Sequence, residues 1–256
     1  MENNYEFNVY HESSKLREND IELYSWIGLI NSDTKIRNVI SKPYLSAGSK
    51  NNEVSLPDNN NKNETSLQES IVTRRSNRNF DGEECELEVF SDILKYSAKE
   101  NSIMKYGDGV NWAFRPYPSG GGLYPIEMYV YVNNVQKLDN GIYYYNPKRH
   151  SLSEIENINL IDKLESAMPT LENEIKKSSF IVFLVSNMNK MSFKYMERSY
   201  RFALLECGHL AQNILLLTNS YNLKSFPAGA FIDDKVNNFL NLDTSHSNIQ
   251  YIILNS

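Results

Sequence analysis

The sequence contains few of the residues that mark several common classes of protein. Its two cysteines, Cys85 and Cys207, form no CxxC motif and no Cys/His ligand spacing. This argues against a disulfide framework and a zinc site, so we expect two reduced thiols and no metal. No apolar run approaches the ~20 residues of a membrane span, and the start, "MENNYEFNVYHESSKLREND", is too polar for a signal peptide. We expect a cytoplasmic protein with no membrane partner.

A basic surface is missing as well. The formal net charge is −6, whereas a nucleic-acid backbone requires a basic face, so we expect no nucleic-acid partner. Apolar residues are plentiful: 41% of the 256 residues are hydrophobic. That is enough to bury the core of one large domain, or of a domain that carries an arm.

The chain divides near residue 65. Residues 1–65 are rich in Asn, Ser, Lys and Glu and end in the polar run "KNNEVSLPDNNNKNETS", which predicts an extended N-terminal arm and linker. Within it, "IELYSWIGLI" at residues 21–30 is apolar enough for one short docked helix. Ser66 followed by Glu69 is a capping box that predicts a helix over residues 67–75. We expect the folded domain to span residues 66–256.

Helices and strands then follow one another along the domain. A second helix is predicted within residues 85–98, and "YRFALLECGHLAQNILLLTNSYNL" predicts a long helix that is apolar on nearly all sides and therefore buried and central. A short helix is expected in "DDKVNNFLNL". Runs of β-branched and aromatic residues predict strands at residues 125–132, 140–147, 179–186 and 249–254. This pattern indicates an α+β fold with helices layered on a sheet.

Two segments have the composition of an anion or ligand site. In "TRRSNRNF", three guanidiniums and the Ser76 hydroxyl could enclose a phosphate, although an arginine-rich helix end is more often a solvated surface. In "FRPYPSGGGLYP", three glycines between prolines let a backbone approach a ligand closely. This loop is neither a P-loop nor a dinucleotide fingerprint, and a plain tight turn remains the alternative.

Further candidates lie near and within the long helix. The turn "FPAGAF" has backbone amides that could contact a planar heterocycle, or it is a simple connection. In "ECGHLAQN", Gln212 and Asn213 are polar positions of an apolar helix and need partners. In "SFKYMERSYRF", Lys194 and Tyr195 are adjacent, so they cannot share a helical face and must lie on a loop or first turn. Burial and nearby arginines would lower the pKa of Lys194 and allow it to act as a base. The alternative is that both residues are exposed, as lysine and tyrosine at a helix start usually are.

Taken in order, these segments resemble the SagB-type dehydrogenases of the FMN-dependent nitroreductase superfamily. The matching residues are "VYHESSK", "LPD", "SLQESIVTRRSNRNF", "RPYPSGGGLYPIEMYVYV", "GIYYYNP", "FKYMERSYRFALLECGHLAQNILL" and "FPAGAFIDD". The resemblance implies a nitroreductase-like fold, with a central, mostly antiparallel sheet flanked by helices and a long buried central helix. It also implies a homodimer with FMN at its interface.

The resemblance also implies roles for individual residues. Lys194 and Tyr195 match the catalytic Lys-Tyr pair of azoline-oxidising members, with Lys194 as the base and Tyr195 orienting the ring. The residues that the resemblance assigns to FMN are Arg74, Arg75, Ser76 and Arg78 for the phosphate, and Pro118, Ser119, Gly120, Gly121, Gly122, Gln212, Asn213, Pro227, Ala228 and Gly229 for the rest of the flavin. The chain ends in "YIILNS", without the basic residue that many small nitroreductases place there, so we expect the arginine cluster to carry the phosphate.

The implied function is maturation of a ribosomally made peptide. Thiazolines or oxazolines in a precursor peptide would be oxidised to thiazoles or oxazoles, with a cyclodehydratase complex as partner and recogniser of the leader. The first alternative is an NAD(P)H-dependent nitroreductase or flavin reductase that acts on small molecules. The second is a scaffold subunit of a cyclodehydratase complex.

Overall fold

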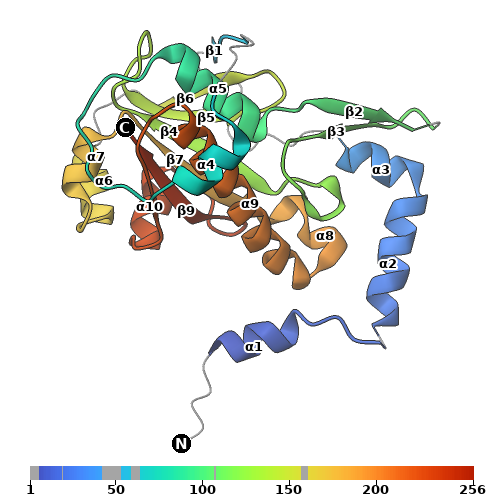
Figure 1. Ribbon diagram of the computed structural model, residues 1–256. Coiled ribbons are helices and arrows are strands. Elements are labelled where there is room, and N and C mark those ends of the chain that lie inside the picture. The colour runs from blue at the N-terminus through green and yellow to red at the C-terminus, as the bar shows by residue number, and fades with distance from the viewer. Residues whose placement is uncertain (1–5, 19, 42–52, 59–63, 107, 157–160) are drawn as a thin grey trace, which may run out of the picture.

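A seven-stranded antiparallel sheet forms the centre of the molecule (Figure 1). The computed structural model describes residues 6–18, 20–41, 53–58, 64–106, 108–156 and 161–256. The strand order is β1-β6-β5-β4-β7-β9-β8. The strands are β1 (Glu53–Ser55), β4 (Ile126–Val132), β5 (Gly141–Asn146), β6 (Ser151–Glu156), β7 (Phe180–Asn187), β8 (Ser225–Ala228) and β9 (Ser247–Asn255). The four predicted strands correspond to β4, β5, β7 and β9, so the expectation of an antiparallel α+β fold is confirmed.

Helices cover both faces of this sheet. Side chains alternate along a strand, so Val130 and Leu184 join the core on one face while Tyr131 and Phe183 join the core on the other. The first core packs under α5 and α9, and the second packs under α6, α7 and α10. These helices are α5 (Leu87–Ala98), α6 (Ile161–Ala167), α7 (Glu172–Lys177), α9 (Arg198–Ser220) and α10 (Asp233–Phe239).

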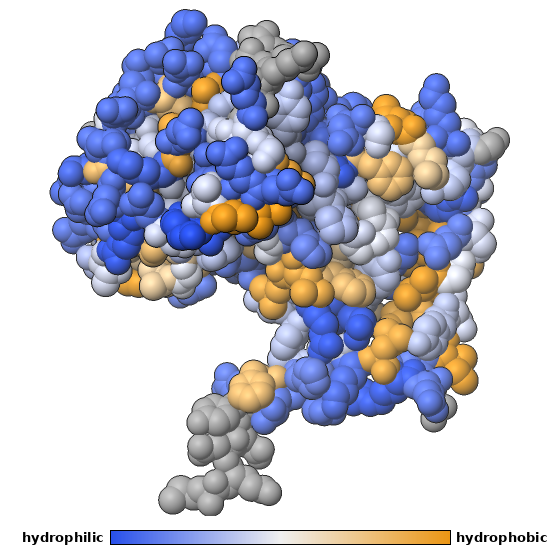
Figure 2. Space-filling view, viewed as in Figure 1, coloured by the Kyte–Doolittle hydropathy of each residue, from blue (hydrophilic) through white to orange (hydrophobic). Residues whose placement is uncertain are grey.

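The long helix α9 is central but not enclosed in the single chain. One of its faces is buried, with Ala203, Leu210 and Ile214 fully covered. On the opposite side Leu204 and Leu205 are 42% and 56% exposed. The expectation of a buried helix therefore holds for one face of α9 and is corrected for the other face in the isolated chain. Apolar side chains are also exposed on the neighbouring helix α4 (Leu67–Thr73), over which Figure 2 shows an orange patch.

The N-terminal segment contains more structure than expected. It forms α1 (Glu6–Ser13), α2 (Ile21–Ser32) and α3 (Thr34–Ile40), of which only α2 was predicted. In Figure 1 these blue helices project from the core, and α3 ends near the hairpin formed by β2 (Ser102–Lys105) and β3 (Asn111–Phe114). We call residues 6–41 the arm. Strand β1 pairs with β6, so the end of the predicted linker belongs to the sheet. The predicted linker also runs through residues 42–52 and 59–63, which lie outside the described residues.

Other elements had not been predicted. A separate hairpin pairs β2 (Ser102–Lys105) with β3 (Asn111–Phe114). Strand β8 contains Pro227 and occupies a segment that was interpreted as a turn. A proline is tolerated there because β8 is an edge strand. Across the described part of the chain, no helix combines the length and the apolarity needed to cross a membrane.

Candidate active site

The adjacent lysine and tyrosine lie in a single helical turn, α8 (Ser192–Tyr195), directly before α9. Only 5% of the Lys194 surface is exposed, and this burial lowers the pKa of its amine. Its Nζ donates a hydrogen bond to Asn31 Oδ1 at 3.0 Å and lies 5.3 Å from the centre of the Tyr195 ring. Burial raises the pKa of the Tyr195 hydroxyl. The pair therefore combines a buried amine of reduced basicity with a protonated phenol.

The glycine loop lies directly against this pair. Gly120–Gly122 form the single 3₁₀ turn η1, in which Gly121 has a φ of +64°. A Cβ atom on Gly121 would lie 2.5 Å from Tyr195 Oη and 3.1 Å from Lys194 Nζ. A Cβ on Gly122, whose φ is +66°, would lie 2.8 Å from Trp112 Nε1. Glycine is therefore required by both backbone conformation and close approach, and the explanation as a plain tight turn is insufficient.

A buried carboxyl group lies near the same loop. Glu206 of α9 is only 2% exposed, and burial raises its pKa to about 7, opposed in part by the nearby Ser119 hydroxyl and Arg115 guanidinium. Among the described residues, neither carboxyl oxygen meets the geometry of a hydrogen bond. Ser119 Oγ instead accepts from the Tyr124 amide at 2.8 Å. The "ECGHLAQN" motif predicted buried polar residues at Gln212 and Asn213, whereas the buried polar side chain of this motif is Glu206.

A cavity of about 320 Å³ adjoins the other side of the loop. Its walls include three aromatic side chains, Trp112, Tyr124 and Phe193, and two cations, Arg115 and Lys190. Lys190 is paired with the buried Glu127 at 2.8 Å. Gly122 lines the cavity and Gly121 packs against Lys194, so the cavity and the lysine adjoin the same loop. The chain thus offers a partly apolar space for a substrate next to a buried amine.

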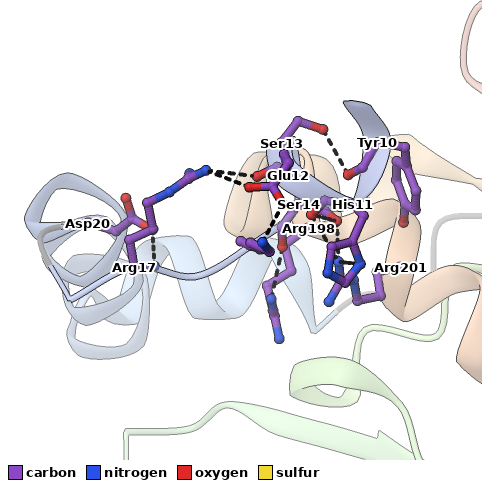
Figure 3. Close-up of polar contacts among 10 residues, drawn as sticks. Tyr10, His11, Glu12, Ser13, Ser14, Arg17, Asp20, Arg198 and Arg201 are labelled. Atoms are coloured by element: carbon purple, nitrogen blue, oxygen red, sulfur yellow. Dashed lines mark hydrogen bonds and ion pairs between the residues drawn. The ribbon is translucent and has the colours of Figure 1, made fainter. Parts of the chain in front are cut away.

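The arm is attached to this region. Trp26 Nε1 donates to the carbonyl oxygen of Phe193 at 2.5 Å. Figure 3 shows the second attachment, where two arginines of α9 reach Ser14 after α1. Arg198 Nη1 donates to the Ser14 carbonyl oxygen at 2.9 Å, and Arg201 Nη2 donates to Ser14 Oγ at 2.6 Å. The arginines that were expected to lower the pKa of Lys194 are therefore engaged with the arm.

The arginine cluster follows the helix α4 (Leu67–Thr73). The Ser66 side chain accepts from the Glu69 amide at 3.1 Å, which confirms the predicted cap. Ser76 forms a bridge with Ser225 at the outer edge of β8, and its side chain is exposed. Arg75 Nη1 donates to two carbonyl oxygens at the helix end, those of Val72 and Arg74. The cluster therefore lies at the β8 edge of the sheet.

Arg78 is already occupied. Its Nε forms an ion pair with Glu174 Oε1 at 2.5 Å, and its Nη2 donates to the Thr170 carbonyl oxygen at 2.8 Å. Its guanidinium also lies over the Phe226 ring of β8, 5.2 Å from the ring centre. Arg74 and Arg75 are thus the arginines of the cluster without an ion pair among the described residues.

The remaining predicted residues lie on and after β8 and on α9. Pro227 and Ala228 form the end of β8 and Gly229 follows it. Gln212 is exposed on the outward face of α9, whereas Asn213 lines a second cavity of about 480 Å³ with Thr65 and other residues. No three His, Cys, Asp or Glu side chains of the described residues are grouped so that they could hold a metal ion.

The predicted residues therefore form two separate groups. The loop at Pro118, Ser119 and Gly120–Gly122 meets Lys194 and Tyr195 before the N-terminal end of α9. The arginine cluster follows Thr73, whose hydroxyl accepts from Asn219 Nδ2 at 2.8 Å near the C-terminal end of α9. This helix has 23 residues and is about 34 Å long. The first group can abstract a proton, and the second can bind an anion.

Known proteins share both the sequence and the fold. Residues 71–254 match the model of the nitroreductase family. The nitroreductase homologue MJ1384 of Methanocaldococcus jannaschii is 30% identical over 74% of this chain and 90% of its own length. The microcin B17-processing protein McbC of Escherichia coli is 32% identical over 50% of this chain, and the trifolitoxin-processing protein TfxB of Rhizobium leguminosarum bv. trifolii is 28% identical over 62%. The matches span 49% and 44% of those two proteins.

Two solved structures illustrate the shared fold. A chain of the E. coli microcin synthetase McbBCD complex, with truncated pro-MccB17 bound, superposes with a TM-score of 0.59 at 20% identity, covering 94% of this chain and 97% of that chain. A nitroreductase-type protein from Desulfovibrio desulfuricans, in complex with FMN, gives 0.50 at 16% identity and covers 75% and 86%. Because the family model matches most of its length and a 30% identical relative covers 74% of it, the chain belongs to the nitroreductase family.

Proposed function

We propose that the protein is an FMN-dependent dehydrogenase that oxidises thiazoline or oxazoline rings of a ribosomally made peptide to thiazoles or oxazoles. The observation that carries this proposal is the position of Lys194 and Tyr195 against Gly121. It provides a buried amine of lowered pKa beside a glycine-lined surface and a cavity. Kinship with McbC and TfxB, both named for processing of a peptide product, supports the same reaction.

The donor groups of the chain fit FMN. Arg74, Arg75 and Ser76 would hold the phosphate, with Arg78 adding charge from its ion pair with Glu174. The rest of the flavin would contact the loop at Pro118, Ser119, Gly120, Gly121 and Gly122, the helix residues Gln212 and Asn213, and Pro227, Ala228 and Gly229. At Gly121 the room that a Cβ would take is filled by Tyr195 Oη and Lys194 Nζ, so the glycine brings these two side chains against the loop that would contact the flavin. When bound, FMN supplies the acceptor for the hydride that leaves the azoline.

Residues of the protein itself accept the proton that leaves the azoline ring. Aromatisation removes a proton from one ring carbon and a hydride from its neighbour. The neutral amine of Lys194 takes the proton at Nζ, so that a C–H bond breaks and an N–H bond forms. Tyr195, whose ring packs edge-on against Phe202 at 5.0 Å, is held in place to orient the azoline. Burial favours this role because it keeps more of the amine neutral.

Each complete site would require two chains. The base and the arginine cluster lie at opposite ends of α9, a helix of about 34 Å, which is longer than an FMN molecule. A second copy that supplied its own Gly121 loop and Lys194 could complete the site begun by Arg74 and Arg75. Exposed Leu204 and Leu205 on α9 offer apolar surface for such a homodimer.

The substrate places the protein after a cyclodehydratase. An azoline arises by cyclisation and dehydration of Cys, Ser or Thr in a precursor peptide, so a cyclodehydratase complex must act first. We propose that this complex and the azoline-bearing precursor are the partners of the protein. The likeness of fold to a chain of the McbBCD complex supports an assembly of this type.

The direct test supplies a synthetic thiazoline peptide to the FMN-loaded protein. We expect the peptide to lose the mass of two hydrogens per ring, measured by mass spectrometry. Lys194→Ala should lower this rate ~100-fold or more, since a positioned base contributes about that much, while FMN stays bound. Lys148→Ala, a change at an exposed lysine, is the matched control. Near-normal turnover by the Lys194 variant would refute its role as the base.

The second candidate is a nitroreductase or flavin reductase that consumes NAD(P)H and acts on small molecules. The match to MJ1384 favours it, since that relative is covered over 90% of its length. The two functions differ in electron flow, because azoline oxidation reduces the flavin without a nicotinamide. Rapid NAD(P)H oxidation with a nitroaromatic and no reaction with azoline peptides would select this candidate.

A further inference from the structure

The amine of Lys194 is held by a residue of the arm. Asn31 is 163 positions away in sequence, and its Oδ1 accepts the hydrogen bond from Lys194 Nζ at 3.0 Å. Asn31 lies in the last turn of α2, outside residues 71–254 that match the nitroreductase family. Trp26, earlier on α2, donates to the Phe193 carbonyl oxygen at 2.5 Å. These two hydrogen bonds thus attach α2 to α8.

We propose that Asn31 is a positioning residue for the reaction: its amide oxygen holds Lys194 Nζ beside Gly121 without placing a negative charge next to the amine. This inference rests on the proposed function of Lys194 as the base. The amine lies between the amide on one side and the glycine loop on the other, where a Cβ on Gly121 would come within 3.1 Å of it. The arm would then complete the active site rather than merely cover it.

The type of side chain at position 31 matters because, among the described residues, no charged neighbour contributes to the shift of the Lys194 pKa. The titratable groups nearby are Tyr195 on α8, the arginines of α9 engaged with Ser14, and Lys190 on η2 (Met188–Lys190), which is paired with Glu127. Burial is the cause that lowers the pKa of the Lys194 amine. A carboxylate at position 31 would favour the ammonium form and cancel this effect, whereas an amide accepts the same hydrogen bond without a charge.

The first experiment measures the contact without any substrate. Competitive acetylation of the FMN-loaded protein across a pH series, read by mass spectrometry of the Lys194 peptide, gives the pKa of that amine. In the isosteric variant Asn31→Asp we expect this pKa to rise by about one unit or more. Asn38→Asp, an exposed position on α3, is the matched control and should leave it unchanged. An unchanged Lys194 pKa in Asn31→Asp would overturn the proposal.

The second experiment measures turnover of the thiazoline peptide. Asn31→Ala should lower kcat about tenfold with little change in KM, because the loss affects orientation of the base rather than substrate binding. Asn31→Asp should move the rising limb of the pH–rate profile to higher pH, since the amine must lose its proton before it can act. Wild-type kcat in Asn31→Ala would overturn the positioning role. If the wild-type protein oxidises no azoline, the proposed function fails, and the acetylation result still decides whether Asn31 controls Lys194.

Discussion

At the scale of single residues, Gly121 links the backbone to the chemistry. Its φ of +64° is unfavourable for other residues, and a Cβ there would overlap Tyr195 Oη. We expect Gly121→Ala to displace Tyr195 or the loop and to lower azoline turnover about 10²-fold, as a shift of ~1 Å at a reacting group can do. Turnover and FMN content would be measured on the same preparation, so that a loss of turnover per bound FMN is distinguished from a loss of FMN.

The control for this change is a glycine with similar backbone strain but no neighbour. Gly109 has a φ of +85°, and a Cβ there would meet no atom within 4 Å. Gly109→Ala should therefore cost stability, measured as a lower Tm, and leave turnover intact. Equal losses of turnover in the two variants would show that strain alone, and not the contact with Tyr195, explains the effect.

Residue-scale prediction from sequence succeeded where the signal was local. Lys194 and Tyr195 were expected on a loop or first turn, and α8 is one turn. Asn31 was not predicted, because a contact across 163 positions leaves no pattern in the sequence. Glu206 was not singled out, although it lies three residues after Ala203 and four before Leu210, the helical spacing of the buried face of α9.

At the scale of secondary structure elements, a buried histidine fastens the segment after β1 to the core. His150 Nδ1 lies 2.9 Å from Tyr145 Oη, and its Nε2 lies 2.8 Å from Ser91 Oγ on α5 and 3.2 Å from the Pro57 carbonyl oxygen. Burial lowers the pKa of His150 from 6.5 to about 4. The unfolded chain therefore takes up this proton near pH 6.5, whereas the folded chain resists until about pH 4.

Acid should consequently destabilise the fold through His150. The stability that this group contributes is present above pH 6.5 and is lost as the pH falls toward 4. We expect the wild-type Tm to decline over that interval, and His150→Gln to show a shallower decline, measured by thermal melts in a pH series. His209→Gln, at an exposed position on α9, should follow the wild-type slope. An unaltered slope in His150→Gln would contradict this explanation.

The elements that were predicted and those that were missed differ in their burial. Strands β4 and β7 are buried along their whole length and consist mainly of apolar and aromatic residues, so the sequence pattern indicates them clearly. The edge strand β8 was missed because its proline suggests a turn. The position of β8 at the edge of the sheet is evident only from its pairing with β9 in the structure. The helices α1 and α3 were missed because their residues are mostly polar and bury little.

At the scale of the whole molecule, the fold places the proposed base and the proposed phosphate-binding arginines far apart in one chain. The arm, the glycine loop and α8 gather at one end of α9, and the arginine cluster and β8 lie toward the other. Sequence resemblance placed all these residues in one site, and a single chain does not bring them together. In the proposed homodimer a second chain would bring them together, and no periodicity within one sequence indicates such an arrangement.

The length of α9 has a genetic consequence. If each flavin is held by the arginines of one chain and served by the lysine of the other, two inactive variants should rescue each other. Mixing Arg74→Ala/Arg75→Ala chains with Lys194→Ala chains, followed by subunit exchange, would leave one intact site in each mixed dimer and restore about a quarter of wild-type turnover. If both groups served the same flavin from one chain, the mixture would stay as inactive as its components. Restored turnover in a mixture of two inactive variants would thus show that α9 is too long for one chain to complete a flavin site alone.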